Sequence, residues 1–246
     1  MNDPLAAAGL SERDVAALGA VLGLLAADRG APSAVTDPDR AWRVHVADSL
    51  TGLEVDELRA ARHIADVGSG AGFPGLALAV ALPAAEVDLI ESTGRKCEFM
   101  RRAIRTAEMA NARVVCERAE SWASRPPPEG GRAAYDAVTA RAVGRLATLA
   151  ELAAPLLATS GILVAWKGRR DPEEEAELER AGERLAMAPV TVSWVGPYAG
   201  SRHRHLHVLR KVGPTPAGIP RRPGMAKKRP LGRARGRGTP LPPRPK

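Results

Sequence analysis

The chain has 246 residues, of which 45% are apolar and only 3% are aromatic. This length and composition suit one soluble domain with a core of Ala, Val and Leu, and no apolar run approaches the ~20 residues that a membrane-spanning helix requires. The net charge of +8 comes entirely from residues 221–246, which hold ten Lys or Arg residues and no acid, so residues 1–220 carry a net charge of −2.

Hydrophobic periodicity predicts alternating helices and strands along the chain. Helical patterns occur near residues 11–28, 38–51, 73–82, 94–110, 145–158 and 172–187. Strand patterns occur near residues 62–67, 86–91, 113–117, 135–140, 161–166, 190–195 and 205–212. We expect a helical cap at residues 1–58 that packs on an α/β core at residues 59–220, followed by a basic Pro-, Gly- and Arg-rich flexible tail at residues 221–246.

The most informative segment follows the first strand, where glycines come directly before a helix. Glycine allows close backbone approach to a ligand, and the start of a helix presents unpaired amide groups. The spacing Gly70-x-Gly72-x-x-Gly75 matches a dinucleotide fingerprint. The spacing Asp66-x-Gly68-x-Gly70-x-Gly72 is associated with S-adenosylmethionine (SAM), whose amino acid end needs an acidic partner such as Asp66. Either match is weak alone, so both ligand classes remain open at this point.

Polar residues at the ends of later strands point to the same edge of the sheet. Glu91 ends the second strand, where it can accept hydrogen bonds from ribose hydroxyls. After the third strand, Ala119 and Glu120 combine a small and an acidic side chain, which suits the edge of an adenine. Arg141 ends the fourth strand. Ligands of open α/β sheets bind at this carboxyl edge.

The last two strands favour SAM over a dinucleotide. No clear helix separates them, so a hairpin through residues 196–200 is expected. A reversed C-terminal strand distinguishes the sheets of SAM methyltransferases from those of ordinary dehydrogenases. We therefore predict a Rossmann-like SAM-dependent methyltransferase fold, with a seven-stranded, mostly parallel sheet, an antiparallel C-terminal strand and a helical N-terminal extension.

The two cysteines show no metal-ligand spacing, and no metal site is predicted. We expect Cys97 and Cys116 to be small buried residues in a reducing compartment. The first residues lack the basic flank of a secretory signal peptide, so a cytoplasmic protein without a membrane partner is expected.

The basic tail cannot bury enough apolar surface to fold alone. Flexible cationic segments bind nucleic acid by releasing condensed counterions, which favours a nucleic-acid partner. A solvated solubility tail and a contact with acidic lipid are the alternatives.

Several motifs, in order along residues 36–231, resemble the RsmG family, also called glucose-inhibited division protein B, whose members methylate guanine N7 in small-subunit ribosomal RNA. The matching elements are Asp37-Pro38, Arg43-Val-His45-x-x-Asp48-Ser49, Asp66-Val-Gly-Ser-Gly-Ala-Gly-Phe-Pro-Gly75, Glu91-Ser-x-Gly-Arg-Lys96, Arg118-Ala-Glu120, Ala140-Arg-Ala142, Trp166-Lys-Gly168, and Pro220-Arg-Arg-x-Gly with Lys228-x-Pro-Leu231. One departure is the stretch from Ala31 to Ala34, where the family shows Asn-Leu-Thr.

The resemblance implies roles for individual residues. Cofactor contacts are implied for Gly68, Phe73, Glu91, Ala119, Glu120 and Arg141, and the glycine spacing described above adds Asp66, Gly70 and Gly72. Arg141 and Lys167 are expected to donate hydrogen bonds to guanine O6 or to phosphate. RNA contacts are expected from Arg95, Lys96, Arg221, Arg222, Lys227 and Lys228.

The implied reaction needs no general base, because guanine N7 carries an in-plane lone pair and no proton. The enzyme has only to position and desolvate the base. His45 and Asp48, three residues apart on an expected helix, form either a local hydrogen-bonded pair or a wall of the pocket. The expected substrate is ribosomal RNA, the small subunit or an assembly intermediate, and a monomer is expected. A SAM enzyme acting on a small molecule or protein, and a noncatalytic RNA-binding assembly protein, are the alternatives.

Overall fold

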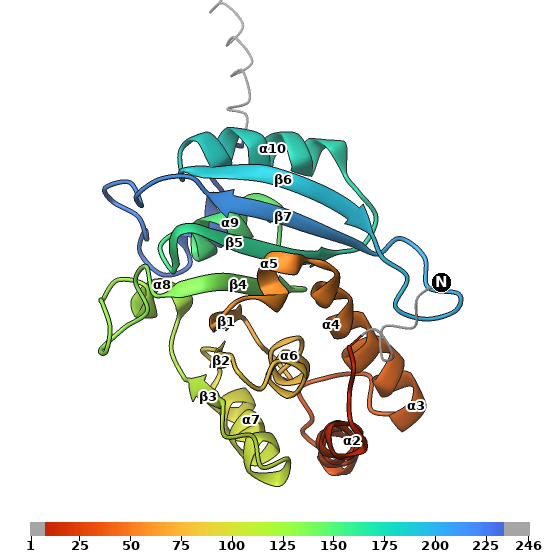
Figure 1. The fold of residues 1–246 in the computed structure, drawn as a ribbon. Helices are drawn as coiled ribbons and strands as arrows, with labels where there is room; N and C mark the ends of the chain where they lie inside the picture. The colour runs from red at the N-terminus through yellow and green to blue at the C-terminus, as the bar shows by residue number, and fades with distance from the viewer. Residues whose placement is uncertain (1–7, 234–246) are drawn as a thin grey trace, which may run out of the picture.

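The computed structural model describes residues 8–233, whose central element is one seven-stranded sheet (Figure 1). The strand order is β3-β2-β1-β4-β5-β7-β6. The strands are β1 (His63–Val67), β2 (Glu86–Ile90), β3 (Ala112–Val115), β4 (Tyr135–Arg141), β5 (Leu157–Lys167), β6 (Met187–Trp194) and β7 (His205–Lys211). The order reverses between β1 and β4, which places a ligand crevice at the carboxyl ends of these two strands.

Strand β7 runs antiparallel to both of its neighbours, β5 and β6, whereas the pairs among β1 to β5 are parallel. The predicted hairpin between the last two strands is therefore confirmed, together with the mostly parallel seven-stranded sheet. This hairpin carries the loop before β7 to the carboxyl ends of the parallel strands.

Helices cover both faces of the sheet and bury two separate cores (Figure 1). Alternate residues of a strand face opposite sides, so Ile64 packs with one set of helices and Ala65 with the other. The first set contains α2 (Glu12–Ala27), α6 (Gly75–Ala81) and α7 (Gly94–Thr106). The second contains α8 (Ala119–Trp122), α9 (Leu146–Ala153) and α10 (Pro172–Glu183). The short helix α5 (Asp56–Arg59) precedes β1.

Three helices end earlier than the periodicity predicted. Helix α7 ends before Glu108 and α10 before Ala186, and both residues have a positive φ that a helix cannot continue through. Helix α9 ends before Pro155, which cannot donate a helical hydrogen bond. Strands β5 and β6 consequently begin three to four residues earlier than expected, at Leu157 and Met187.

The regular helix expected over residues 38–51 is wrong in detail. The chain forms α3 (Pro38–Ala41), a π-helix η1 (Trp42–Ala47), α4 (Asp48–Leu50) and a 3-10 helix η2 (Thr51–Glu54). Ser49 Oγ donates to the carbonyl of His45, and the Trp166 indole donates to the carbonyl of Asp48 at 2.8 Å. These groups compete for carbonyls that a regular α-helix would use, which sequence periodicity does not register.

The flexible tail predicted to begin at residue 221 is wrong for its first part. Residues 221–232, here called the C-terminal strap, pack against α9 and include helix α11 (Met225–Lys228). Arg221 donates two hydrogen bonds of 2.5 Å to the buried carboxylate of Glu151, and Leu231 is buried in the second core. The remaining tail, residues 234–246, and residues 1–7 of the expected cap lie outside the described part of the chain.

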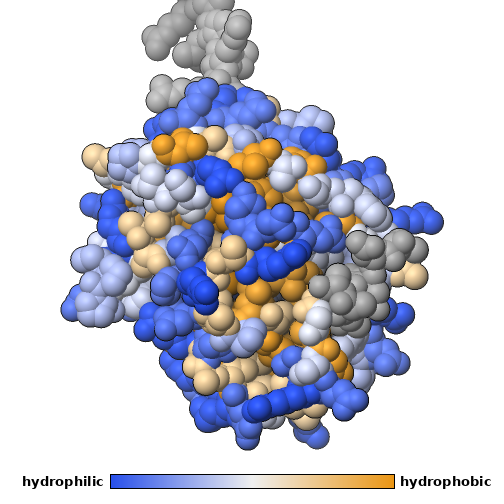
Figure 2. Space-filling model, in the orientation of Figure 1, coloured by the Kyte–Doolittle hydropathy of each residue, from blue (hydrophilic) through white to orange (hydrophobic). Residues whose placement is uncertain are grey.

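Hydrophilic side chains cover most of the face shown in Figure 2, with smaller apolar areas between them. Of the two cysteines, Cys97 is buried as expected, but Cys116 is exposed because it follows the edge strand β3, where no further strand covers it. In residues 8–233, no helix combines the length and the apolar character needed to cross a membrane.

A buried polar network fixes the end of β3 and helix α8 against the sheet. Tyr135 on β4 donates to Asp88 on β2 at 2.5 Å and accepts a hydrogen bond of 2.8 Å from Trp122 on α8. Arg113 on β3 donates two hydrogen bonds to Asp88. The network positions the start of α8, and with it Ala119 and Glu120.

We expect Tyr135→Phe to lower the free energy of unfolding by about 1–3 kcal/mol, because the buried indole of Trp122 loses its acceptor. Guanidinium denaturation measures the change. Tyr198→Phe is a matched control, because the Tyr198 hydroxyl makes no hydrogen bond to residues 8–233, and we expect a change within about 0.5 kcal/mol. Equal losses in the two variants would contradict the role of the network.

Candidate active site

The glycine loop between β1 and α6 forms the centre of the site, and its backbone requires glycine. Gly68 and Gly72 have φ values of +69° and +93°. A Cβ at Gly68 would lie 2.7 Å from Val143 Cγ2, and one at Gly72 would lie 2.3 Å from Leu76 Cδ1. Both the conformation and the space therefore exclude a side chain at these positions.

Asp66 supports this loop from behind. Its carboxylate accepts hydrogen bonds from Thr139 Oγ1 at 2.9 Å and from the amide of Gly75 at 3.2 Å. Burial raises the pKa of Asp66 to about 6, although these two donors stabilise the ionised form. Asp66 lines neither of the two cavities described below. Asp66 was expected to contact the amino acid end of SAM, but its hydrogen bonds indicate that it positions the glycine loop.

Two adjoining cavities lie along the carboxyl edge of the sheet and share Gly68, Lys96 and Ala142. The first, here called the nucleoside cavity, has a volume of about 430 Å³ and is lined at its strand ends by Glu91, Ala119 and Glu120. Three residues that the sequence predicted to hold one ligand therefore meet in one cavity.

Glu91 is held rigidly at the edge of the nucleoside cavity. Its Oε1 accepts hydrogen bonds of 2.8 Å from the amides of Ser92 and Thr93, and its Oε2 accepts one of 3.3 Å from the amide of Gly70. Burial opposes ionisation, but the hydrogen bonds from Thr93 and the charge of Lys96 outweigh it and keep the pKa of Glu91 below its ordinary value. Glu91 is thus an ionised acceptor, suited to a pair of ribose hydroxyls.

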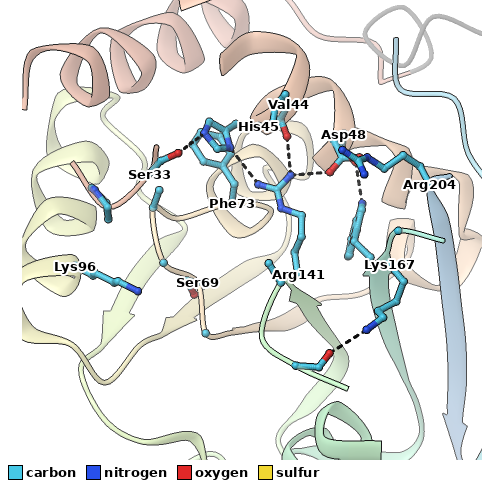
Figure 3. A pocket seen from close by; sticks show the side chains of 18 residues that line it. Ser33, Val44, His45, Asp48, Ser69, Phe73, Lys96, Arg141, Lys167 and Arg204 are labelled. Carbon is cyan, nitrogen blue, oxygen red and sulfur yellow. Dashed lines mark hydrogen bonds and ion pairs between the residues drawn. The ribbon is translucent and has the colours of Figure 1, made fainter. Parts of the chain in front are cut away.

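The second cavity, here called the target cavity, has a volume of about 500 Å³ and lies between the glycine loop and the N-terminal helices. Arg141, at the end of β4, crosses it (Figure 3). Its guanidinium donates to the Val44 carbonyl and to Asp48 Oδ2, both at 2.9 Å, and lies 3.4 Å from His45 Nδ1. His45 and Asp48 both line the cavity, as one of the two alternatives predicted, whereas their side chains contact Arg141 and not each other.

His45 and Phe73 form the apolar wall of the target cavity. Their rings stack with centroids 5.1 Å apart and an interplanar angle of 14°, and Ser33 lies 3.0 Å from His45 Nε2 (Figure 3). Burial and the charge of Arg141 lower the pKa of His45 to about 4. The imidazole is therefore neutral at pH 7 and forms a flat surface on which an aromatic base can stack.

Other predicted site residues are already engaged. Lys167 Nζ lies 2.7 Å from Glu174 Oε1 and donates to the Gly144 carbonyl, so its charge is neutralised. Arg221 is committed to Glu151. The remaining residues predicted to bind RNA lie at or near the rims of the cavities: Lys96, Lys227 and Lys228 line them, whereas Arg95 and Arg222 are exposed outside them.

One buried acceptor in the target cavity makes an ion pair but no hydrogen bond in the described part of the chain. Asp48 Oδ1 makes no hydrogen bond within residues 8–233, and neither does Arg204 Nε, which lies 3.5 Å from it. Neither Arg204 nor Ser33 was predicted as a site residue. Arg204 had one available signal, its place between the hairpin loop and β7, and Ser33 lies in the stretch from Ala31 to Ala34 that departs from the family pattern. A buried carboxylate oxygen without a donor is costly unless a ligand supplies one.

Comparison with known proteins identifies the family. A family model described as rRNA small subunit methyltransferase G matches residues 31–205. The ribosomal RNA small subunit methyltransferase G of Chloroflexus aggregans is 41% identical over 209 residues, 83% of this chain and 84% of that protein. The chain belongs to the rRNA small subunit methyltransferase G family. The ribosomal RNA small subunit methyltransferase G of Synechococcus sp. (strain JA-3-3Ab) is 38% identical over 205 residues, 80% of this chain and 77% of that protein. The predicted family of methyltransferase enzymes is confirmed.

A solved structure shows how widely the methyltransferase G fold is shared. The apo form of SibL, an S-adenosylmethionine-dependent methyltransferase, superposes with a TM-score of 0.55 at 17% identity, covering 78% of this chain and 62% of that chain. At this identity the likeness concerns the fold alone, and it confirms the predicted Rossmann-like methyltransferase architecture.

The lowered pKa of His45 predicts a pH-dependent stability. Because unfolded His45 binds a proton below about pH 6.5 and folded His45 only near pH 4, the unfolded state holds more protons between these values, and stability falls as the pH decreases through this window. Between pH 7.5 and pH 4.5, the free energy of unfolding should decrease by about 2–3 kcal/mol less in His45→Asn than in the wild type. Urea denaturation over this pH range measures the difference.

The exposed His63, at the opposite end of β1, provides the control for this experiment. His63→Asn should leave the pH dependence of the wild type in place. If His45→Asn and the wild type lost stability equally between pH 7 and pH 4.5, the inferred neutrality of His45 would be wrong.

Proposed function

We propose that this chain transfers the methyl group of SAM to N7 of a guanine in small-subunit ribosomal RNA. The observation that carries the proposal is the pair of adjoining cavities that share Gly68, Lys96 and Ala142. A methyl donor bound in the nucleoside cavity would lie next to an acceptor bound in the target cavity, beside these shared residues. The names of the relatives support ribosomal RNA as the source of the acceptor.

The residues of the nucleoside cavity fit the nucleoside of SAM. The ionised Glu91 would accept the ribose hydroxyls, Glu120 would accept from the exocyclic amine of adenine, and Ala119 leaves room for the ring. SAM supplies an electrophilic methyl group on a sulfonium. The cations that line the target cavity each form an ion pair with a carboxylate and add little repulsion toward that positive charge: they are Lys96, Arg141, Lys167 and Arg204.

The target cavity fits a guanine. Guanine presents donors at N1 and N2 beside the O6 acceptor. Asp48 Oδ1, which accepts no hydrogen bond within residues 8–233, is an acceptor of the kind these donors need. The stacked rings of His45 and Phe73 offer an apolar surface for its face. Because a base inside a helix cannot reach such a cavity, the target guanine would be unstacked or extruded.

The reaction follows from the chemistry of N7. The N7 lone pair forms a bond to the methyl carbon while the sulfur–methyl bond breaks and the sulfur keeps the electron pair, so no proton has to leave the base. The chain's own groups therefore act by orienting the base and excluding water. The neutral His45 adds no positive charge against the developing cationic purine.

The RNA around the target guanine would contact the basic rim. Arg95, Arg222, Lys227 and Lys228 are exposed near the two cavities, and such cations bind phosphates without reading sequence. We propose that one chain acts alone, because residues of a single chain line both cavities. We also propose that it acts in the cytoplasm, on the small subunit or an assembly intermediate.

The test incubates the protein with methyl-labelled SAM and unmethylated small ribosomal subunits, then digests the RNA to nucleosides. We expect label in 7-methylguanosine, and a 10- to 100-fold lower kcat/KM for Asp48→Asn, because this change replaces an acceptor for the base by a donor. The Kd for SAM should change less than twofold.

Asp39→Asn on the exposed side of α3 is the matched control, because Asp39 makes no side-chain hydrogen bond to residues 8–233, and it should retain full activity. SAM binding without label in subunits or naked RNA would contradict the ribosomal substrate and point to a small-molecule or protein acceptor. An equal loss of SAM affinity and activity in Asp48→Asn would contradict its assignment to the base.

A further inference from the structure

The C-terminal strap forms one wall of the nucleoside cavity. Gly224, Ala226, Lys227 and Lys228 line this cavity together with Glu91 and Glu120. Ala226 is also buried against α9, whose Thr148 and Leu152 line the same cavity. The family model ends at residue 205, and the strap carries the motifs of residues 220–231 that resemble the family.

The strap makes a direct polar contact with a predicted adenine-binding residue. The amide of Gly224 donates to Glu120 Oε1 at 2.7 Å. Gly224 has a φ of +82°, a conformation that favours glycine and that directs its amide toward α8. Glu120 Oε2 accepts no hydrogen bond within the described residues and stays available to a ligand. The contact therefore holds the carboxylate in one orientation and leaves one acceptor free.

Both ends of the strap are anchored in the core. At its start, Arg221 pairs with Glu151, a carboxylate that is 2% exposed, and also donates to the carbonyl of Arg229. At its end, Leu231 is buried and Arg180 donates to the Gly232 carbonyl at 2.6 Å. Thr148 Oγ1 donates to the Ala226 carbonyl between these anchors. The strap is thus a fixed wall of the cavity and not an arm free to reach for RNA.

We propose that the C-terminal strap is a part of the cofactor site, which positions Glu120 for adenine and encloses the nucleoside of SAM. This inference rests on the proposed use of the nucleoside cavity for SAM. It reassigns Arg221 from RNA binding to the support of the cofactor site, whereas Lys227 and Lys228 remain at the rim. By linkage, a ligand that uses the strap must stabilise the strap to the same degree.

Truncation provides the first test. A chain that ends at residue 233 keeps the strap, and a chain that ends at residue 220 lacks it. We expect calorimetry with S-adenosylhomocysteine to give a Kd within twofold of the full chain for the first and at least tenfold weaker for the second. Thermal unfolding reports whether each truncated chain is folded. A folded chain ending at residue 220 with an unchanged Kd would overturn the proposal.

Hydrogen exchange on the full chain provides the second test, which does not depend on the folding of a variant. Saturating S-adenosylhomocysteine should slow exchange at least tenfold in a peptide spanning residues 221–232 and leave a peptide from α2 unchanged, since α2 lines neither cavity. Binding without slower exchange in the strap would overturn the proposed role of the strap and leave the proposed function standing. Failure of the full chain to bind S-adenosylhomocysteine would instead overturn the proposed function on which it rests.

Discussion

The guanidinium of Arg141 is the interaction on which the target cavity depends. It extends from the end of β4, where the strand order reverses, to Val44, His45 and Asp48 on the N-terminal helices. Only an arginine presents several donors in a fixed planar arrangement to acceptors on different residues. The same contact assembles the cavity, pairs the cation and lowers the pKa of His45. Structure and electrostatics of the site are therefore set together.

Buried ion pairs are the second feature that determines the structure of the site. The ion pairs Arg141 with Asp48, Lys167 with Glu174 and Arg221 with Glu151 each place a cation beside a carboxylate that is at most 10% exposed. A buried pair contributes less to stability than its attraction suggests, because both ions lose water. Here the pairs fix the positions of segments distant in sequence, namely the cap, α10 and the strap, around one edge of the sheet. Within residues 8–233, Asp48 Oδ1 is left with an ion pair to Arg204 but without a hydrogen-bond donor.

The predicted residues that the structure brings to one edge of the sheet share one property: each is placed by local sequence. The glycine loop lies within eight residues, Glu91 directly follows β2, and Ala119 and Glu120 begin the short helix after β3. Because parallel strands end at one edge, these local positions translate into a common cavity. The errors arose where distant partners decide the conformation. Trp166 and Arg141 select the irregular helices around Asp48, Glu151 and the second core hold the strap, and Thr139 turns Asp66 away from the cavities.

The sequence by itself determined the alternation of helices and strands, the reversed last strand, the glycine loop and the ligand edge. Hydrophobic periodicity, the conformational freedom of glycine and the position of a strand end each depend on a few consecutive residues. Their physical effect can therefore be inferred from neighbours along the chain. Only the tertiary structure decided that the N-terminal helices close a second cavity, that one oxygen of Asp48 accepts no hydrogen bond within residues 8–233, and that the basic strap lines the nucleoside cavity. These features depend on contacts between residues 70 to 118 positions apart, which local patterns do not encode.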